Sequence, residues 1–252
     1  MYILPWVLSL VAVSSAAPTN FFDDAYDFSE ELLGYYSKVS QKINQIGQTS
    51  EASAVQCDTS KISLPSYASS LPSPTGLSPL YVGLGRGTQN YTCADSTSGS
   101  TPTAIGAVAN LYNTTCLAAN YPEVLQMLPT IAYKIAIPTS EYATFPPANL
   151  ELMGHHFFYN STTPEFNLDT TTEKQYGIAM TNKIDTIDAP SSATEGQYGA
   201  VAWLYLKAVS GTVGNYKAVY RVDTASGSPP TTCKGMESSF EIQYAALYYF
   251  YG

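Results

Sequence analysis

The sequence predicts a mainly β protein: a single antiparallel β-sandwich or barrel with an N-terminal helix and a short inserted helix. Residues 199–209, GAVAWLYLKAV, form a nearly continuous apolar run that is typical of a central strand. Residues 216–222 alternate in the manner of a strand, with Tyr216, Ala218, Tyr220 and Val222 at every second position. Residues 240–250 continue the pattern, and turns rich in Gly and Ser, such as SGTVGN, separate these runs.

The chain begins with a segment that is typical of a secretory signal peptide. It is apolar from Ile3 to Val13 and then turns to small residues up to Ala16, after which we expect cleavage. A buried N-terminal helix is the alternative. The apolar stretch is shorter than the roughly 20 residues that span a bilayer. We therefore divide the chain into a signal peptide (1–16), a helical and Ser/Thr-rich segment (17–56) and a β-domain (57–252).

The N-terminal helix is predicted over residues 27–47. Apolar residues recur there at three- and four-residue steps, which indicates a packing face. The stripe consists of Phe28, Leu32, Tyr35, Val39, Ile43 and Ile46. Residues 49–78 are rich in Ser, Pro and Thr, and we interpret them as an extended segment pinned by a disulfide at Cys57. The inserted helix is expected to begin at Pro122, because proline is tolerated in a first turn.

Residues 81–93, YVGLGRGTQNYTC, decide between a nucleotide-binding loop and a β-strand. A dinucleotide fingerprint requires G-x-G-x-x-G between a strand and a helix. Here Gly83, Gly85 and Gly87 are evenly spaced, Thr88 occupies the position of the third glycine, and the following residues favour a strand. The motif fails, and glycines at this period instead indicate a strand approached closely by a ring or another backbone.

The cysteines and the sequons favour export. Cys57, Cys93, Cys116 and Cys233 predict two disulfides, with three connectivities possible. Three N-glycosylation sequons lie at Asn90, Asn113 and Asn160. The formal net charge of −9, with 11 basic residues, argues against nucleic acid and anionic membranes as partners. The interrupted apolar pattern at the C-terminus argues against a lipid anchor, and we expect neither a metal nor a cofactor.

Several motifs in order resemble a family of secreted fungal proteins, with shorter bacterial members, that has no known function. The motifs are LYVGLGRGTQNYTC, GHHFF with PEFNL, DAP before GAVAWLYLKAV, YRVDTASGSPPTTC and YAALYYFY, and they span residues 57–251. Fungal members are often labelled malate dehydrogenase, but the failed nucleotide motif gives that activity no support. The resemblance implies a bridge between Cys93 and Cys233, and with it one between Cys57 and Cys116. A local bridge between Cys93 and Cys116 is the rival.

The sequence contains no recognised catalytic motif. His155 and His156 are the only histidines, and neighbours on a strand point to opposite faces, so they would not chelate one metal. A glycosidase pair could arise from scattered carboxylates. The candidates are Asp169, Glu173, Asp185, Asp188 and Glu195. Arg86 near Gln89 is either a structural arginine that binds loop carbonyls or a guanidinium presented to a ligand in a shallow site.

The chain has 21 tyrosines, and those of YAALYYFY occupy both faces of one predicted strand. Tyr249 and Tyr251 would face outward and form a platform for stacking on sugars, whereas the alternative is that all these rings fill a core. We therefore expect a secreted, disulfide-bonded, noncatalytic glycoprotein associated with cell-wall carbohydrate. The second hypothesis is an extracellular carbohydrate-active enzyme that uses a carboxylate pair.

Overall fold

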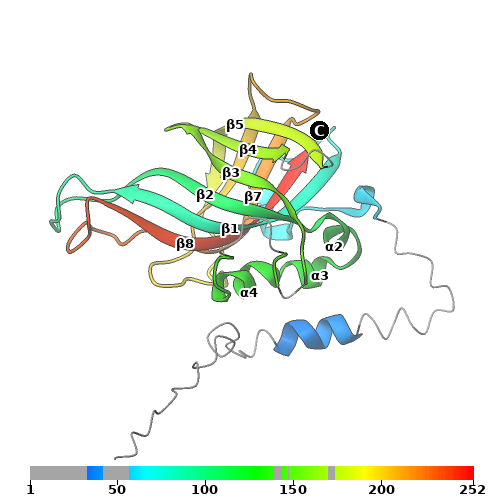
Figure 1. The fold of residues 1–252 in the computed structure, drawn as a ribbon, viewed down its shortest axis with the longest axis horizontal. Helices are drawn as coiled ribbons and strands as arrows, with labels where there is room; N and C mark the ends of the chain where they lie inside the picture. Colours follow the sequence, from blue (N-terminus) through cyan, green and yellow to red (C-terminus); the bar gives the residue numbers. More distant parts are fainter. Residues whose placement is uncertain (1–32, 42–56, 139–143, 147, 170–173) are drawn as a thin grey trace, which may run out of the picture.

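The fold is a closed antiparallel barrel of eight strands, seen in a computed structural model that describes residues 33–41, 57–138, 144–146, 148–169 and 174–252 (Figure 1). Each strand pairs with its neighbour in sequence, and β8 pairs with β1 to close the barrel. The strands are β1 (Pro79–Thr92), β2 (Thr103–Asn113), β3 (Leu152–Asn160), β4 (Thr163–Asp169), β5 (Gln175–Ile187), β6 (Trp203–Ala208), β7 (Ala218–Ser226) and β8 (Ser239–Tyr251). The sequence left sandwich or barrel open, and the structure forms the barrel.

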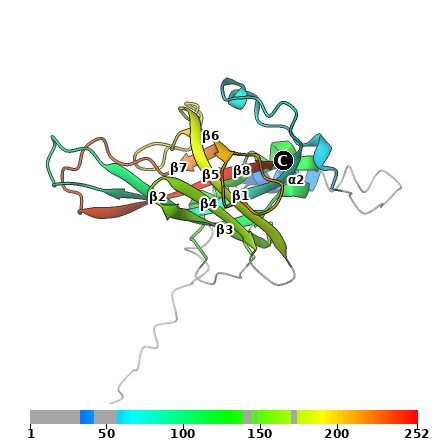
Figure 2. The ribbon, with the colours of Figure 1, turned by 90° about the horizontal axis from the view of Figure 1, so that it is seen from above.

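Short helices cover one side of the barrel wall. Between β2 and β3 the chain forms α2 (Thr115–Asn120), α3 (Pro122–Leu125) and α4 (Leu128–Lys134), which we call the helical layer. Figure 1 shows this layer beside β1 and β8, and Figure 2 shows the barrel from above. Pro122 begins α3, as predicted, so the expected inserted helix is one of three consecutive helices. Two short 3-10 helices, η1 (Thr59–Lys61) and η2 (Ser66–Ser70), precede β1.

The predicted N-terminal helix is confirmed where the structure describes it. Residues 33–41 are helical, Tyr35 is buried, and Val39 packs against the same hydrophobic cluster as the helical layer. The signal segment 1–16 and the other four residues of the apolar stripe lie outside the described residues.

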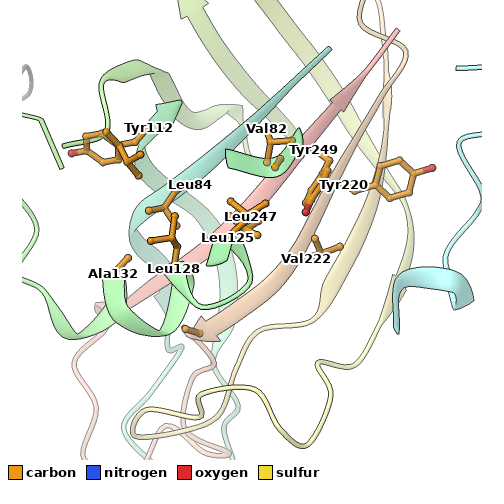
Figure 3. Close-up of a cluster of buried hydrophobic side chains, with 14 of the residues drawn as sticks. Val82, Leu84, Tyr112, Leu125, Leu128, Ala132, Tyr220, Val222, Leu247 and Tyr249 are labelled. Carbon is orange, nitrogen blue, oxygen red and sulfur yellow. The ribbon is translucent and has the colours of Figure 1, made fainter. Parts of the chain in front are cut away.

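The wall of the barrel separates two hydrophobic cores. The outer core lies between the outward face of β1, β7 and β8 and the helical layer (Figure 3). There Leu125 and Leu128 of the helices lie against Leu84 of β1 and Leu247 of β8. The inner core fills the barrel and is rich in aromatic rings, including Phe166, Tyr216, Tyr248 and Phe250. Because both cores use β8, this strand is buried on both faces over residues 244–251.

The three evenly spaced glycines of β1 all face the inner core. A Cβ atom on Gly85 would lie 2.5 Å from Cε2 of Tyr248, and one on Gly83 would lie 3.1 Å from the Met153 sulfur. At Gly87 a Cβ would collide with backbone atoms of β2. The sequence interpretation of these glycines as sites of close approach is therefore confirmed, because their missing side chains leave room for large rings inside the barrel.

Two disulfides form in the structure, in the pairing that the resemblance implied. Cys93 and Cys233 have Cα atoms 5.8 Å apart and join the end of β1 to the segment before β8. Cys57 and Cys116, with Cα atoms 4.8 Å apart, tie the segment before the barrel to α2. Both separations lie in the usual range for disulfides.

Candidate functional site

The candidate site is a cavity of about 650 Å³ inside one end of the barrel, which we call the barrel-mouth cavity. It lies where β1, β3, β5 and β7 end, whereas aromatic rings of the inner core fill the rest of the interior. Apolar lining side chains include Phe158, Pro164, Val201, Leu204 and Leu206. Uncharged polar ones include Ser161, Thr162, Asn182, Thr186 and Ser228. The lining therefore combines apolar surface with hydrogen-bonding groups, as small-molecule sites do.

Strand alternation selects the polar residues of β1 that reach this cavity. Gln89 lies on the same face of β1 as the three glycines, points into the barrel and is 7% exposed. Its Nε2 is buried and makes no hydrogen bond within the described residues. Burial raises the pKa of Tyr244, and the Gln89 amide lies within reach of the Tyr244 hydroxyl and lowers that pKa by a smaller amount. The buried Nε2 thus lies beside the Tyr244 hydroxyl and the cavity, without a hydrogen bond of good geometry.

Arg221 of β7 is the buried cation of the cavity. Its Nε and Nη2 donate to the carbonyl oxygen of Ala202 at 3.3 and 2.8 Å, and Nη1 donates to Oε1 of Gln89 at 3.4 Å. Lys183, exposed near the rim, is the other cation of the lining. Among the described residues no Asp or Glu lines the cavity, and Arg221 forms no ion pair. The cavity is thus cationic in a chain with a net charge of −9.

Two tyrosines and one histidine lie behind Arg221. The hydroxyls of Tyr244 and Tyr248 are 2.8 Å apart and buried. His156 donates from Nδ1 to the carbonyl oxygen of Glu165 at 2.9 Å and stacks on Phe166. Burial lowers the pKa of His156 to about 4, so the imidazole is neutral at neutral pH. The guanidinium of Arg221 therefore supplies the positive charge at the inner end of the cavity.

Arg86 does not share a ligand site with Gln89, which corrects the hypothesis that its guanidinium is presented to a ligand. It has a structural role. It lies on the opposite face of β1, is 1% exposed, and donates to the carbonyl oxygens of Tyr133 and Ile135 at the end of α4. It also donates to Oε1 of Gln243 at 2.6 Å. Burial lowers its pKa to about 10, so the charge is retained at neutral pH. The structural alternative stated for Arg86 is the one that the contacts support.

Tyr249 and Tyr251 do not form an outward platform. Each is 3% exposed and belongs to the outer core, because the helical layer and the segment before β1 cover the outward face of β8. Tyr251 stacks edge to face with Tyr220 at 5.5 Å. The sequence-based proposal that these two rings bind sugar is wrong, and the alternative that they fill a core is correct.

The two histidines point to opposite faces of β3, as expected. His155 is half-buried and hydrogen-bonds Asn110, while His156 faces the barrel interior. No cluster of three or more metal-ligating side chains exists among the described residues. Of the candidate carboxylates, none that is described lines the barrel-mouth cavity, and Glu173 lies outside the described residues. Asp169 instead accepts a hydrogen bond from the backbone N–H of Gly177 at 2.5 Å.

The three sequon asparagines differ in exposure. Asn160 is exposed at the end of β3, beside the turn to β4, where its Oδ1 accepts hydrogen bonds from the backbone and hydroxyl of Thr162. Asn90 and Asn113 are half-buried, and Oδ1 of Asn113 accepts from the backbone N–H of Thr115. Asn160 therefore offers the most accessible amide, beside the rim of the barrel-mouth cavity.

Comparisons with known proteins give two family matches. Residues 73–252 match the family described as Protein of unknown function (DUF3455), and residues 8–72 match Protein of unknown function (DUF2990). No curated protein and no solved structure matches the chain. No helix in the described part of the chain has the length and apolar character needed to cross a bilayer.

Proposed function

The chain belongs to the DUF3455 family of proteins of unknown function, and from its barrel-mouth cavity we propose that it is an exported, noncatalytic protein that binds a small ligand there. The cavity carries the proposal, since its volume of about 650 Å³ suits a small molecule. Two disulfides are compatible with an extracellular location, and the signal-like segment and sequons support export.

The lining supports a binding role and offers little for catalysis. A glycosidase needs two carboxyl groups flanking one bond, and no described carboxylate lines the cavity. The histidine closest to the inner end, His156, is buried, stacked and hydrogen-bonded to a backbone carbonyl. A general base must instead reach the substrate proton.

A soluble saccharide from the cell wall is the ligand class that we propose first. Side chains with hydroxyl and amide groups, such as Thr162 and Asn182 near the rim, can bond sugar hydroxyls. Phe158 supplies an aromatic surface inside the cavity, on which the apolar face of a sugar ring can stack. This arrangement replaces the outward tyrosine platform, which is buried.

The test is calorimetric titration of the purified protein with soluble chitin and β-glucan oligosaccharides. Ser161→Trp should block the mouth and abolish binding while leaving the sequon of Asn160 intact. Tyr159→Trp is the matched control, because Tyr159 is 70% exposed in the same hairpin and is not part of the lining. Binding that survives Ser161→Trp would place the ligand elsewhere, and no saturable binding of either saccharide would remove the saccharide proposal.

A further inference from the structure

We propose that the ligand carries a carboxylate, which Arg221 and Gln89 bind at the inner end of the barrel-mouth cavity. This inference rests on the proposed function and assigns the charge of the ligand. It follows from three features of the cavity: a buried cation without a counter-ion, a buried amide donor without a well-formed hydrogen bond, and a described lining that is apolar beside the charge and has no acidic side chains.

The first feature is the state of Arg221. Moving a charged group out of water is costly unless the group is paired and hydrogen-bonded. Arg221 is 9% exposed, yet its partners are one backbone carbonyl, one amide oxygen at the long distance of 3.4 Å, and the hydroxyl of Tyr248, whose pKa burial raises and a hydrogen bond from Arg221 lowers. All three are neutral groups. An incoming carboxylate would supply the missing negative charge.

Arg86 provides the comparison within the same protein. It is also buried without a carboxylate, but five acceptors from three segments, β1, β8 and the end of α4, surround its guanidinium. It does not line the barrel-mouth cavity. Arg221 has one carbonyl and one amide acceptor besides the Tyr248 hydroxyl, and it does line the cavity. Binding of several backbone carbonyls explains why Arg86 is buried, but it does not explain why Arg221 is buried beside a cavity.

The second feature is the donor geometry. A guanidinium has five N–H groups, and the three bonds of Arg221 leave two of them. Burial raises the pKa of Tyr248, and a hydrogen bond from Arg221 acts in the opposite direction, so the Tyr248 hydroxyl takes up part of this remaining donor capacity. Nε2 of Gln89, joined to Arg221 through its own Oε1, adds another donor. Several donors thus converge where a planar, two-oxygen acceptor can be held.

The third feature is the described lining, which has no acidic side chain and is apolar beside the charge. Leu204, Leu206 and Phe158 would contact the remainder of the ligand while its acid group meets Arg221. Both sugar acids and apolar organic acids have this chemistry. Lys183 at the rim would attract either kind of anion without fixing its orientation.

Two matched pairs of probes test whether the ligand is an anion and whether it is a sugar acid or an apolar acid. The first pair is an oligogalacturonate and its methyl ester, and the second is phenylpropanoate and phenylpropanamide. Calorimetry on the full chain should show that the acid of one pair binds at least about tenfold more tightly than its neutral partner. The pair that shows this preference identifies a sugar acid or an apolar acid.

Variants show which residues cause the preference for the acid over its neutral partner. Arg221→Met should abolish this preference, Arg221→Lys should retain part of it, and Gln89→Met should reduce it. Lys183→Met should cost only about two- to threefold, as expected of an exposed charge. Lys207→Met, an exposed cation of β6 outside the cavity, should change nothing. The comparison of acid with neutral probe in the unmodified protein still decides the matter if a variant fails to fold.

The other outcomes separate this inference from the proposed function. Equal binding of acid and neutral probes, blocked by Ser161→Trp, would overturn the carboxylate and leave a small-ligand site. Absence of binding for all four probes would overturn the carboxylate, and the proposed function would then stand only if the neutral wall saccharides bind.

Discussion

Arg86 donates two hydrogen bonds to the carbonyl oxygen of Ile135, from Nε at 3.3 Å and from Nη2 at 3.0 Å. Ile135 is the residue that follows α4, and helix C-terminal carbonyls lack partners within the helix. A single side chain of β1 thus holds the end of the helical layer to the barrel wall.

Arg86→Lys should therefore destabilise the protein. An ammonium group cannot donate in the fork geometry, so several buried carbonyls would lose their donors. We expect a loss of about 1–3 kcal/mol in the free energy of unfolding, measured by urea denaturation. Lys234→Met, at an exposed cation, is the control and should be neutral. Unchanged stability of Arg86→Lys would contradict the structural role.

Gly85→Ala should destabilise the barrel without changing its surface. The added Cβ would lie 2.5 Å from the Tyr248 ring, and overpacking of this kind costs about 1–3 kcal/mol. Gly99→Ala is the matched control, because its Cβ would meet nothing closer than 3.9 Å. Thermal unfolding of the two variants measures the difference, and equal midpoints would show that the ring can move aside.

Two buried groups should give the stability opposite dependences on pH. Burial lowers the pKa of His156 from 6.5 to about 4, so between these values the unfolded chain binds more protons and stability rises with pH. Burial raises the pKa of Asp223 from 3.8 to about 7, so there the folded chain binds more protons and stability falls as pH rises. In the wild-type protein the two contributions offset each other over much of this range.

Single variants should separate them. Asp223→Asn keeps a residue that tolerates the positive φ of 48° and should leave a stability that rises with pH, by at most about 1.4 kcal/mol per pH unit. His156→Gln should leave a stability that falls with pH. Urea denaturation at several pH values measures both slopes, and slopes of the same sign in the two variants would refute the assignment.

Enzymatic removal of N-glycans should lower the apparent mass of the secreted protein. Asn160 should carry most of the glycan, because it is exposed in a turn, while Asn90 and Asn113 are half-buried. Thr162→Ala, which destroys that sequon, should therefore remove most of the mass shift. An unchanged mass of the secreted protein after deglycosylation would exclude the glycoprotein hypothesis.

Strands β1, β6, β7 and β8 could be predicted from the sequence, but which of their faces meets solvent could not. Alternation along β8 places Tyr248 and Tyr249 on opposite faces, which the structure confirms. A period of two does not say which face meets solvent, and over residues 244–251 neither face does. The helical layer that covers Tyr249 comes from between β2 and β3, so no local pattern in β8 reports it.

Part of the candidate site could be predicted from the sequence. The sequence indicates Gln89, which lines the cavity, and Arg86, which does not. Parity along β1 could have separated them, since Gly85, Gly87 and Gln89 share one face and Arg86 lies on the other. Arg221 and Lys217 occupy the same alternating positions in the sequence, yet Lys217 is exposed and Arg221 is buried. The local pattern therefore does not place Arg221 inside the barrel, because that position depends on closure of the sheet.

Pairing between the first and last strands also constrains how the chain folds. Thr92 pairs with Ser239 and Tyr81 with Phe250, so β1 keeps an open edge until nearly the whole chain has been synthesised. Such distant pairing slows folding and exposes an edge that can recruit other chains. Cys93 follows β1 and Cys233 precedes β8, so a bridge formed early in an oxidising compartment shortens the loop that the final strand must close. Chains kept reduced during synthesis should therefore aggregate more readily than chains that oxidise as they emerge.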